Sequence, residues 1–450
     1  MKKNKQYVII FAWKKESKVN YLETLMPIGI AMTAGLLLSR LVKKFKLPAV
    51  TGYLIAGILV GPYCLGQLAT LTGVEWLGFA NAEAVESNGI LSKVALGFIA
   101  FAIGDEFRIS QLKKIGKQAT VIGIFQAIVA TLVVDLALIG LCQFLPEDVI
   151  NTPAALVLGA VATATAPAAT LMVVRQYKAK GKLTDILLPV VAIDDAVGLV
   201  VFAVSFGIAG SMHNGIGLSA ISVLVEPLLE VFLSLLLGFV LGILFSAAEK
   251  YFKSNSKRLT LSITFVIMAV ALSMFETHIC GVHIKFSSLL VCMMLGTVFC
   301  NMCDFSDEIM GKTDKWTAPL FLLFFVLSGA ELKFDMFGNW LVVLVGVVYI
   351  ITRSIGKMAG ASVSAKMTKC DPMITKYLGI TLLPQAGVAL GMSMIAAESL
   401  GEAGAMIRNI TLFAVLIYEL VGPMLTKIAL TKAGDITPRK VINLGEEDDE

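Results

Sequence analysis

Long apolar runs, separated by short polar connections, occupy most of the chain. A helix needs about 20 mostly apolar residues to cross about 30 Å of hydrocarbon, and backbone polar groups in lipid must bond within the protein. Segmentation on this length predicts an all-α polytopic membrane protein with about 13 transmembrane helices. The predicted segments are 25–42, 48–66, 89–106, 118–142, 153–174, 184–209, 219–247, 259–276, 286–302, 315–331, 338–362, 374–396 and 405–429.

Composition agrees with this prediction. Of the 450 residues, 57% are apolar and only 16% are charged, so a soluble globule would have too little polar surface to cover its core. We divide the chain into an N-terminal segment 1–24, a transmembrane domain 25–430 and a cytoplasmic tail 431–450. The N-terminal segment is rich in lysine, and the sequence does not reveal its role.

The positions of lysine and arginine predict the orientation. Orientation follows the basic residues of short loops rather than net charge. If the first helix starts outside, alternate connections carry twenty basic residues, whereas the opposite connections carry only Lys285, Lys333 and Arg408. The prediction is a multi-pass inner-membrane protein with its N-terminus outside and its C-terminus in the cytoplasm.

Two prolines among small residues predict interruptions within helices. The fifth segment contains Pro167 in Ala162–Ala168, and the twelfth contains Pro384 in Leu383–Ala389. An odd number of helices separates the starts of two six-helix halves, so the halves are expected to be inverted repeats. Discontinuous helices in matching positions are typical of transporter sites, because freed carbonyls and half-helix ends face an ion. A simple proline kink is the alternative for each position.

Asp194 and Asp195 are adjacent carboxylates near the centre of the sixth segment. A charge at the bilayer centre costs at least about 2.5 kcal/mol, so an acid there suggests a functional site. Burial and mutual repulsion should separate their proton affinities, so that at least one binds a proton or a cation near physiological pH. Competition for one carboxylate is by itself an antiport mechanism. A neutral, hydrogen-bonded pair that holds helices together is the alternative.

The eleventh segment supplies a basic partner, because Arg353 and Lys357 lie one turn apart on one helix face. Arg353 should be level with the aspartates, whereas Lys357 should lie about 6 Å nearer the cytoplasm. Depth therefore favours Arg353. The choice matters because arginine keeps its proton in proteins, while a buried lysine can release it. It stays open, since a long lysine bridges a one-turn mismatch and either side chain can snorkel to the interface.

Two further acids lie within predicted helices, Asp135 in the fourth segment and Glu419 in the thirteenth. Asp135 has no obvious partner, and Glu419 is expected to pair within the bundle rather than to carry ions. The cysteines and histidines form no cluster with metal-ligand spacing, so neither a resident metal nor any other cofactor is expected.

These motifs resemble the sodium/hydrogen exchanger family of the cation–proton antiporter superfamily, in its bacterial Asp-Asp form. The resemblance extends from about residue 25 to 430. It rests on Thr165-Ala166-Pro167, on Ala192-Ile193-Asp194-Asp195, on the basic residue of the eleventh segment, on Pro384–Gly391 and on Glu419–Pro423.

The resemblance implies a homodimer in which one group of helices forms the dimer scaffold. A second group, with two crossed discontinuous helices, would move as an elevator. It also implies that Asp195 binds the transported ion and that Asp194 pairs with the basic residue. The Thr165 hydroxyl offers one neutral oxygen at the break.

Two departures from the family pattern limit these implications. Electroneutral members have an Asn-Asp pair with arginine, and electrogenic members have an Asp-Asp pair with lysine. This chain combines Asp-Asp with both Arg353 and Lys357, so the stoichiometry is open. Many exchangers also read Thr-Asp-Pro where this chain has Ala166, which removes one carboxylate.

The predicted function is monovalent cation:proton antiport, with Na⁺ as the expected cation at Asp195. The expected partners are Na⁺ (or Li⁺ or K⁺), H⁺, the lipid bilayer and a second copy of the chain, and no nucleic acid. K⁺/H⁺ exchange is the nearest alternative, followed by Na⁺-coupled organic-anion transport and a structural or sensory role. Enzyme activity is not expected, because an intramembrane aspartyl protease needs aspartates on separate helices, and adjacent residues on one helix point about 100° apart.

Overall fold

The computed structural model describes most of the chain, from residue 21 to residue 436. The described ranges are 21–45, 47–74, 76–105, 107–112, 116–147, 149–213, 225–279, 282–334 and 338–436. Most of the predicted N-terminal segment, residues 1–20, and the end of the predicted tail, residues 437–450, lie outside these ranges.

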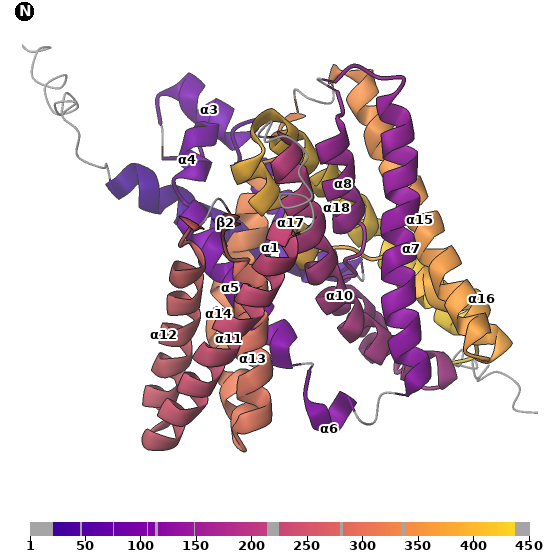
Figure 1. The fold of residues 1–450 in the computed structure, drawn as a ribbon. Coiled ribbons are helices and arrows are strands. Elements are labelled where there is room, and N and C mark those ends of the chain that lie inside the picture. The colour runs from indigo at the N-terminus through magenta and orange to yellow at the C-terminus, as the bar shows by residue number, and fades with distance from the viewer. Residues whose placement is uncertain are drawn as a thin grey trace, which may run out of the picture.

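Helices make up most of the described structure (Figure 1). They are α1 (Tyr21–Lys44), α2 (Ala49–Val60), α3 (Leu65–Thr72), α4 (Ala82–Glu86), α5 (Gly89–Asp105), α6 (Ile109–Leu112), α7 (Lys117–Cys142), α8 (Thr152–Val161), α9 (Pro167–Tyr177), α10 (Lys182–His213), α11 (Glu226–Tyr251), α12 (Asn255–Ser273), α13 (Ser288–Met302), α14 (Ser306–Ala330), α15 (Trp340–Met367), α16 (Pro372–Thr381), α17 (Gly387–Ser399) and α18 (Gly401–Lys432). The prediction of a helical protein is confirmed.

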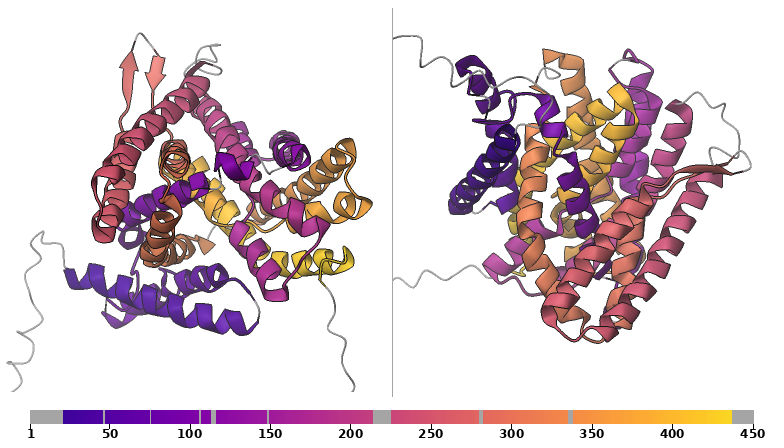
Figure 2. Two further views of the ribbon diagram at one scale, coloured as in Figure 1. Left: turned by 90° about the horizontal axis from the view of Figure 1, so that it is seen from below. Right: turned by 90° about the vertical axis from the view of Figure 1, so that its left-hand side faces the viewer.

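A short antiparallel hairpin is an addition that the sequence pattern did not predict. It consists of β1 (Thr277–Ile279) and β2 (Val282–Ile284), which connect α12 to α13. The strands project from the edge of the helices (Figure 2). A three-residue strand is too short to give a clear alternating pattern in the sequence.

Each predicted segment overlaps a helix or a pair of half-helices. In the described ranges, eight helical stretches are long and apolar enough to cross a membrane. Three other apolar helices, α8, α13 and α17, are shorter, with 10, 15 and 13 residues. Two of these three, α8 and α17, belong to predicted segments that the structure interrupts.

The helices form two bundles that lie side by side (Figures 1 and 2). The first, which we call the support bundle, contains α1, α2, α5 and α11–α14. The second, the site bundle, contains α7–α10 and α15–α18. In Figure 1 the support-bundle helices α11–α14 lie on the left, and α7, α15 and α16 lie on the right.

Small residues bring the helices of the support bundle close together. A Cβ added to Gly57 of α2 would lie 1.9 Å from the carbonyl oxygen of Val326 in α14. A Cβ on Gly104 of α5 would lie 2.2 Å from the carbonyl oxygen of Met293 in α13. Such contacts replace the hydrophobic driving force that helices lack within lipid.

The fifth and twelfth predicted segments are broken, and their halves are built alike. α8 ends at Val161 and α9 begins at Pro167, while α16 ends at Thr381 and α17 begins at Gly387. Proline has no N–H and disfavours helical backbone in the residue before it, so each break falls beside a proline. Asn151 caps α8 and Asp371 caps α16, each accepting a backbone N–H at 3.0 Å.

The two breaks cross each other inside the site bundle. The backbone N–H of Ala166 donates to the carbonyl oxygen of Pro384 at 2.8 Å. Gln385 donates to the carbonyl oxygen of Val161 at 2.9 Å. The two unwound stretches therefore supply hydrogen-bond partners to each other, as buried backbone requires.

Candidate ion-binding site

Asp194 and Asp195 lie on α10, beside the crossing of the two breaks. Their exposed fractions are 0% and 2%. Gly198, one turn further along α10, permits this approach, because a Cβ there would lie 2.5 Å from the Thr163 hydroxyl oxygen. The sixth predicted segment thus presents its paired acids to the unwound backbone of the fifth.

Both carboxylate oxygens of Asp194 accept hydrogen bonds. Gln126 of α7 donates its side-chain amide to Oδ1, and the Thr165 hydroxyl donates to Oδ2. Lys357 Nζ donates to the same Oδ2 at 2.6 Å and forms an ion pair with it. The Asp194 carboxyl group therefore accepts three hydrogen bonds, one of them from a charged donor.

Lys357, and not Arg353, contacts Asp194. The depth argument that favoured Arg353 is wrong, and the alternative that a long lysine side chain bridges the one-turn difference is the one observed. The ammonium group also donates to the carbonyl oxygen of Thr163 and to the Thr165 hydroxyl, the latter at 3.0 Å. Its three donors are therefore all used, although the side chain is completely buried.

Arg353 binds the backbone of both breaks instead. Its guanidinium donates to the carbonyl oxygens of Ala162 at 3.0 Å, Ala164 at 2.6 Å and Leu383 at 2.7 Å. These carbonyls follow the C-terminal ends of α8 and α16, which carry partial negative charge and lack helical partners. One fixed cation therefore compensates two half-helix ends, and it lies 4.5 Å from the ring centre of Tyr418.

Gln126 was not among the predicted site residues. It is buried on α7, and close packing of α7 against α15 places it beside Asp194. Cβ atoms added to Gly356 and Gly360 would lie 2.8 and 2.7 Å from the Cα atoms of Ala130 and Gln126. A glutamine in the apolar middle of a predicted helix was the available signal, since an amide in lipid requires a partner.

Of the two secondary acids, Glu419 differs from expectation, whereas Asp135 Oδ1 has no hydrogen-bond partner among the described residues, as expected. Neither carboxylate oxygen of Glu419 has a hydrogen-bond partner among the described residues, although the side chain is only 1% exposed. The expected pairing of Glu419 within the bundle is therefore wrong for this part of the chain. Asp135 is half-buried, and its carboxyl group lies directly over Gly159 of α8.

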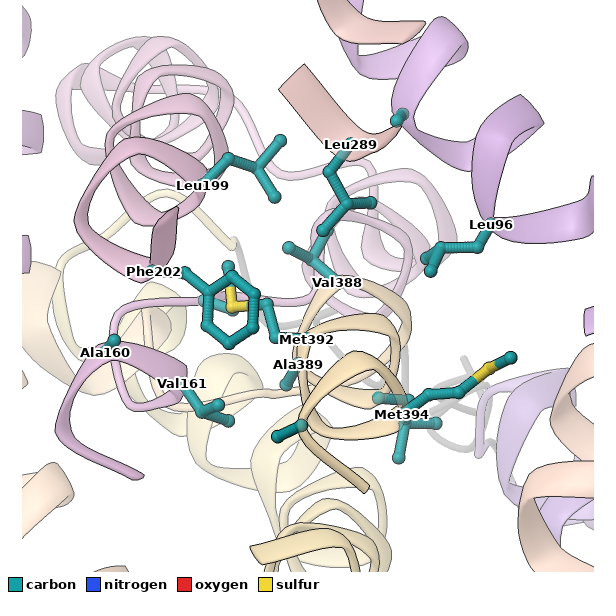
Figure 3. Packing of buried hydrophobic residues seen from close by; sticks show 14 of the residues in the cluster. Leu96, Ala160, Val161, Leu199, Phe202, Leu289, Val388, Ala389, Met392 and Met394 are labelled. Carbon is teal, nitrogen blue, oxygen red and sulfur yellow. The ribbon is translucent and has the colours of Figure 1, made fainter. Parts of the chain in front are cut away.

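A group of apolar side chains, which we call the apolar layer, borders a cavity at the interface of the two bundles. Leu199 and Phe202 of this layer lie on the same face of α10 as Asp195. The cavity has a volume of about 570 Å³, and Leu96 and Phe202 are part of its lining. Leu199, Val388 and Met392 gather with these two residues (Figure 3). Phe202 is about two turns, or about 10 Å, along α10 from Asp195.

Fold and site together define a class of protein. A multi-pass helical membrane protein with buried charges at the crossing of two discontinuous helices has the architecture of a secondary transporter. A family model described as "Sodium/hydrogen exchanger, transmembrane" matches residues 28–432. The chain belongs to the sodium/hydrogen exchanger family.

Individual relatives agree with this assignment. The chain is 25% identical over 364 residues to the Na(+)/H(+) antiporter NhaS4 of Synechocystis, covering 78% of this chain and 83% of that protein. It resembles the structure of the sodium proton antiporter MjNhaP1 from Methanocaldococcus jannaschii at pH 8 with a TM-score of 0.70, over 91% of this chain and 99% of that one. An electron-microscopy structure of MjNhaP1 matches with a TM-score of 0.60, over 92% of this chain and 98% of that one. At 18% identity, both likenesses show the fold alone.

Proposed function

We propose that this protein is a monovalent cation:proton antiporter that exchanges Na⁺ for protons, and that cation and protons compete for Asp195. The observation that carries the proposal is the buried Lys357–Asp194 ion pair, which lies next in sequence to a second buried carboxylate. The Na⁺/H⁺ exchange named for NhaS4 supports Na⁺ as the cation.

The roles of the site residues follow from their contacts. Asp194 is held by Gln126, Thr165 and Lys357, so it serves as a fixed partner. Asp195 points about 100° away along the same helix turn and supplies the exchanging carboxylate. Arg353 keeps the crossing together without losing its charge.

Lys357 gives the site a second titrating group. When Na⁺ binds Asp195, its charge repels the ammonium of Lys357, and we infer that Lys357 then releases its proton. Two protons, one from Asp195 and one from Lys357, would cross for each Na⁺. Exchange would then be electrogenic.

Alternating access would come from movement of the site bundle relative to the support bundle. In this proposal the apolar layer around Leu199 and Phe202, which follow Asp195 on α10, closes the route from Asp195 to the interface cavity. The proposal includes a homodimer in the inner membrane, with the N-terminus outside and the C-terminus in the cytoplasm. The distribution of basic residues supports this orientation.

Dequenching of a pH-sensitive dye in everted membrane vesicles tests the function. Addition of Na⁺ to respiring vesicles should release the accumulated protons, and Li⁺ and K⁺ added in turn define the selectivity. Asp195→Asn vesicles are the matched control. No response to any of the three cations would refute the proposal, and a response to K⁺ alone would replace Na⁺ with K⁺.

A further inference from the structure

Polar contacts join the two bundles at one end of the molecule, the end that carries α3 and α4 in Figure 1. Arg408, near the start of α18, has only 4% of its surface exposed. Across the interface it donates to Glu331 Oε2 and to the Ser328 hydroxyl, both at 2.9 Å. Ser328 lies in α14, and Glu331 follows its last residue.

The same guanidinium also binds the site bundle. Arg408 donates to the carbonyl oxygen of Leu390 at 2.6 Å and to the Ser393 hydroxyl at 3.0 Å, both in α17. α17 is the second half of a broken helix and begins at the crossing. One buried cation therefore connects this half-helix to the support bundle, although its position near a helix start suggested an outer loop residue.

Asn409 adds a second connection beside the first. Its amide oxygen accepts the backbone N–H of Lys333 at 2.9 Å, and its amide nitrogen donates to the Lys333 carbonyl at 3.0 Å. This two-bond clamp and the Arg408 bonds come from adjacent residues and reach the same short stretch, 328–333. They therefore form and break together.

These groups border a cavity that lies between the two bundles. The cavity has a volume of about 1030 Å³ and is lined in part by Glu331, Lys333, Arg408 and Asn409. Separation of the bundles would expose each partner to solvent rather than to lipid, which lowers the cost of breaking the bonds. A connection of this kind is strong enough to bias one conformation and still reversible.

We propose that Arg408 and Asn409, with Glu331 and the backbone of Lys333, form a latch that holds the site bundle against the support bundle. The latch keeps the route past Leu199 and Phe202 closed, and it opens in each transport cycle. This inference rests on the proposed function, because only a protein whose bundles move against each other needs a latch. Its test does not depend on transport.

The rate of thiol labelling at a buried reporter measures latch opening. Leu199→Cys is introduced into a cysteine-free variant and treated in detergent with a hydrophilic maleimide, because Leu199 is 1% exposed within the apolar layer. Glu331→Gln removes the charge of the side chain but keeps its shape. We expect labelling to become about tenfold faster, a factor that corresponds to the loss of one hydrogen bond to a charged group. Asn409→Ala should act in the same direction.

Glu398→Gln is the matched control. It breaks the Lys93–Glu398 pair, which also joins the bundles at 3.0 Å but has side chains 37% and 43% exposed. Such a pair contributes little, so labelling should stay within about twofold. Val345→Cys, at a fully buried position in α15, reports general unfolding.

The outcomes separate the latch from the transport proposal. Faster labelling at residue 199 with unchanged labelling at residue 345 supports the latch, even if the vesicle assay shows no antiport. Unchanged labelling in both Glu331→Gln and Asn409→Ala overturns it, even if antiport is normal. If either variant also labels faster at residue 345, that variant has loosened as a whole, and the other one decides. If both do, the two residues stabilise the fold and the latch is refuted.

Discussion

Lys357 Nζ lies 2.6 Å from Asp194 Oδ2, and both side chains are completely buried. Breaking such a pair by removing one partner is costly, because it leaves an uncompensated charge away from water. A substitution in the pair is therefore expected to destabilise the protein, whereas the charge of the neighbouring Asp195 can be removed by substitution without breaking the pair.

Asp195→Asn should abolish exchange and leave a folded protein. An amide neither releases a proton in the physiological pH range nor supplies the negative charge that a cation needs. The measurement is Na⁺-dependent dequenching in everted vesicles, with size-exclusion elution of the purified variant as the test of folding. Exchange at the parent rate would remove Asp195 from the site.

With Lys357 as the partner of Asp194, exchange should move net charge across the membrane. In liposomes without a pH gradient, an inside-positive potential should drive Na⁺ uptake, since two protons would leave for each Na⁺ that enters. Lys357→Arg keeps the charge but not the releasable proton, so it should lose potential-driven uptake. Absence of such uptake in the parent protein would indicate electroneutral exchange with Asp195 alone as the carrier.

Thr165→Ala should raise the apparent KM for Na⁺ about fivefold, with a smaller effect on the maximal rate. The hydroxyl donates to Asp194 and accepts from Lys357, so its loss disturbs the site by about one hydrogen bond, or about 1 kcal/mol. Thr165→Ser is the control and should restore the affinity. Equal KM values for the parent and Thr165→Ala would show that the hydroxyl does not contribute to binding.

Arg353→Met should lower stability by about 3 kcal/mol or more, because it leaves three buried carbonyls without their donor. Thermal unfolding in detergent provides the measurement. Arg353→Lys should recover only part of the loss, since a single ammonium cannot reproduce the geometry of the guanidinium. Full stability in Arg353→Met would show that other donors satisfy the breaks.

Glu419→Met should preserve or raise the melting temperature. The side chain is buried and its oxygens bond to nothing in the described chain, so an apolar side chain of similar length removes a desolvated polar group without breaking a contact. The same thermal measurement applies. A fall of several degrees would reveal a partner or a bound water at this position.

The sequence predicted the broken helices and the paired acids well, because proline, small residues and intramembrane charge have strong local effects. It did not predict the division of labour between Arg353 and Lys357. Arg353 binds three carbonyls that lack helical partners at the breaks and come together only where the two breaks cross, and no local pattern reports that crossing. The depth of a residue along α15 did not predict which side chain reaches Asp194, because that depends on how the neighbouring helices run.

Arg408 and Gln126 were missed for a related reason. A basic residue near a helix start looks like a loop residue, whereas the structure buries Arg408 among acceptors from α14 and α17. Gln126 lies near Asp194 because glycines of α15 draw α7 inward. Both contacts depend on which helices become neighbours, and the sequence pattern of a single helix does not contain that information.

The hydrogen bond from Ala166 to Pro384 has a consequence for protein engineering. Because of this bond, the backbone of each interrupted stretch depends on the position of the other, although more than two hundred residues separate them in the chain. A chimaera that takes residues 162–166 from a relative but retains residues 382–386 would combine two stretches that do not fit each other. Grafts intended to alter ion selectivity should therefore exchange both stretches together with Arg353.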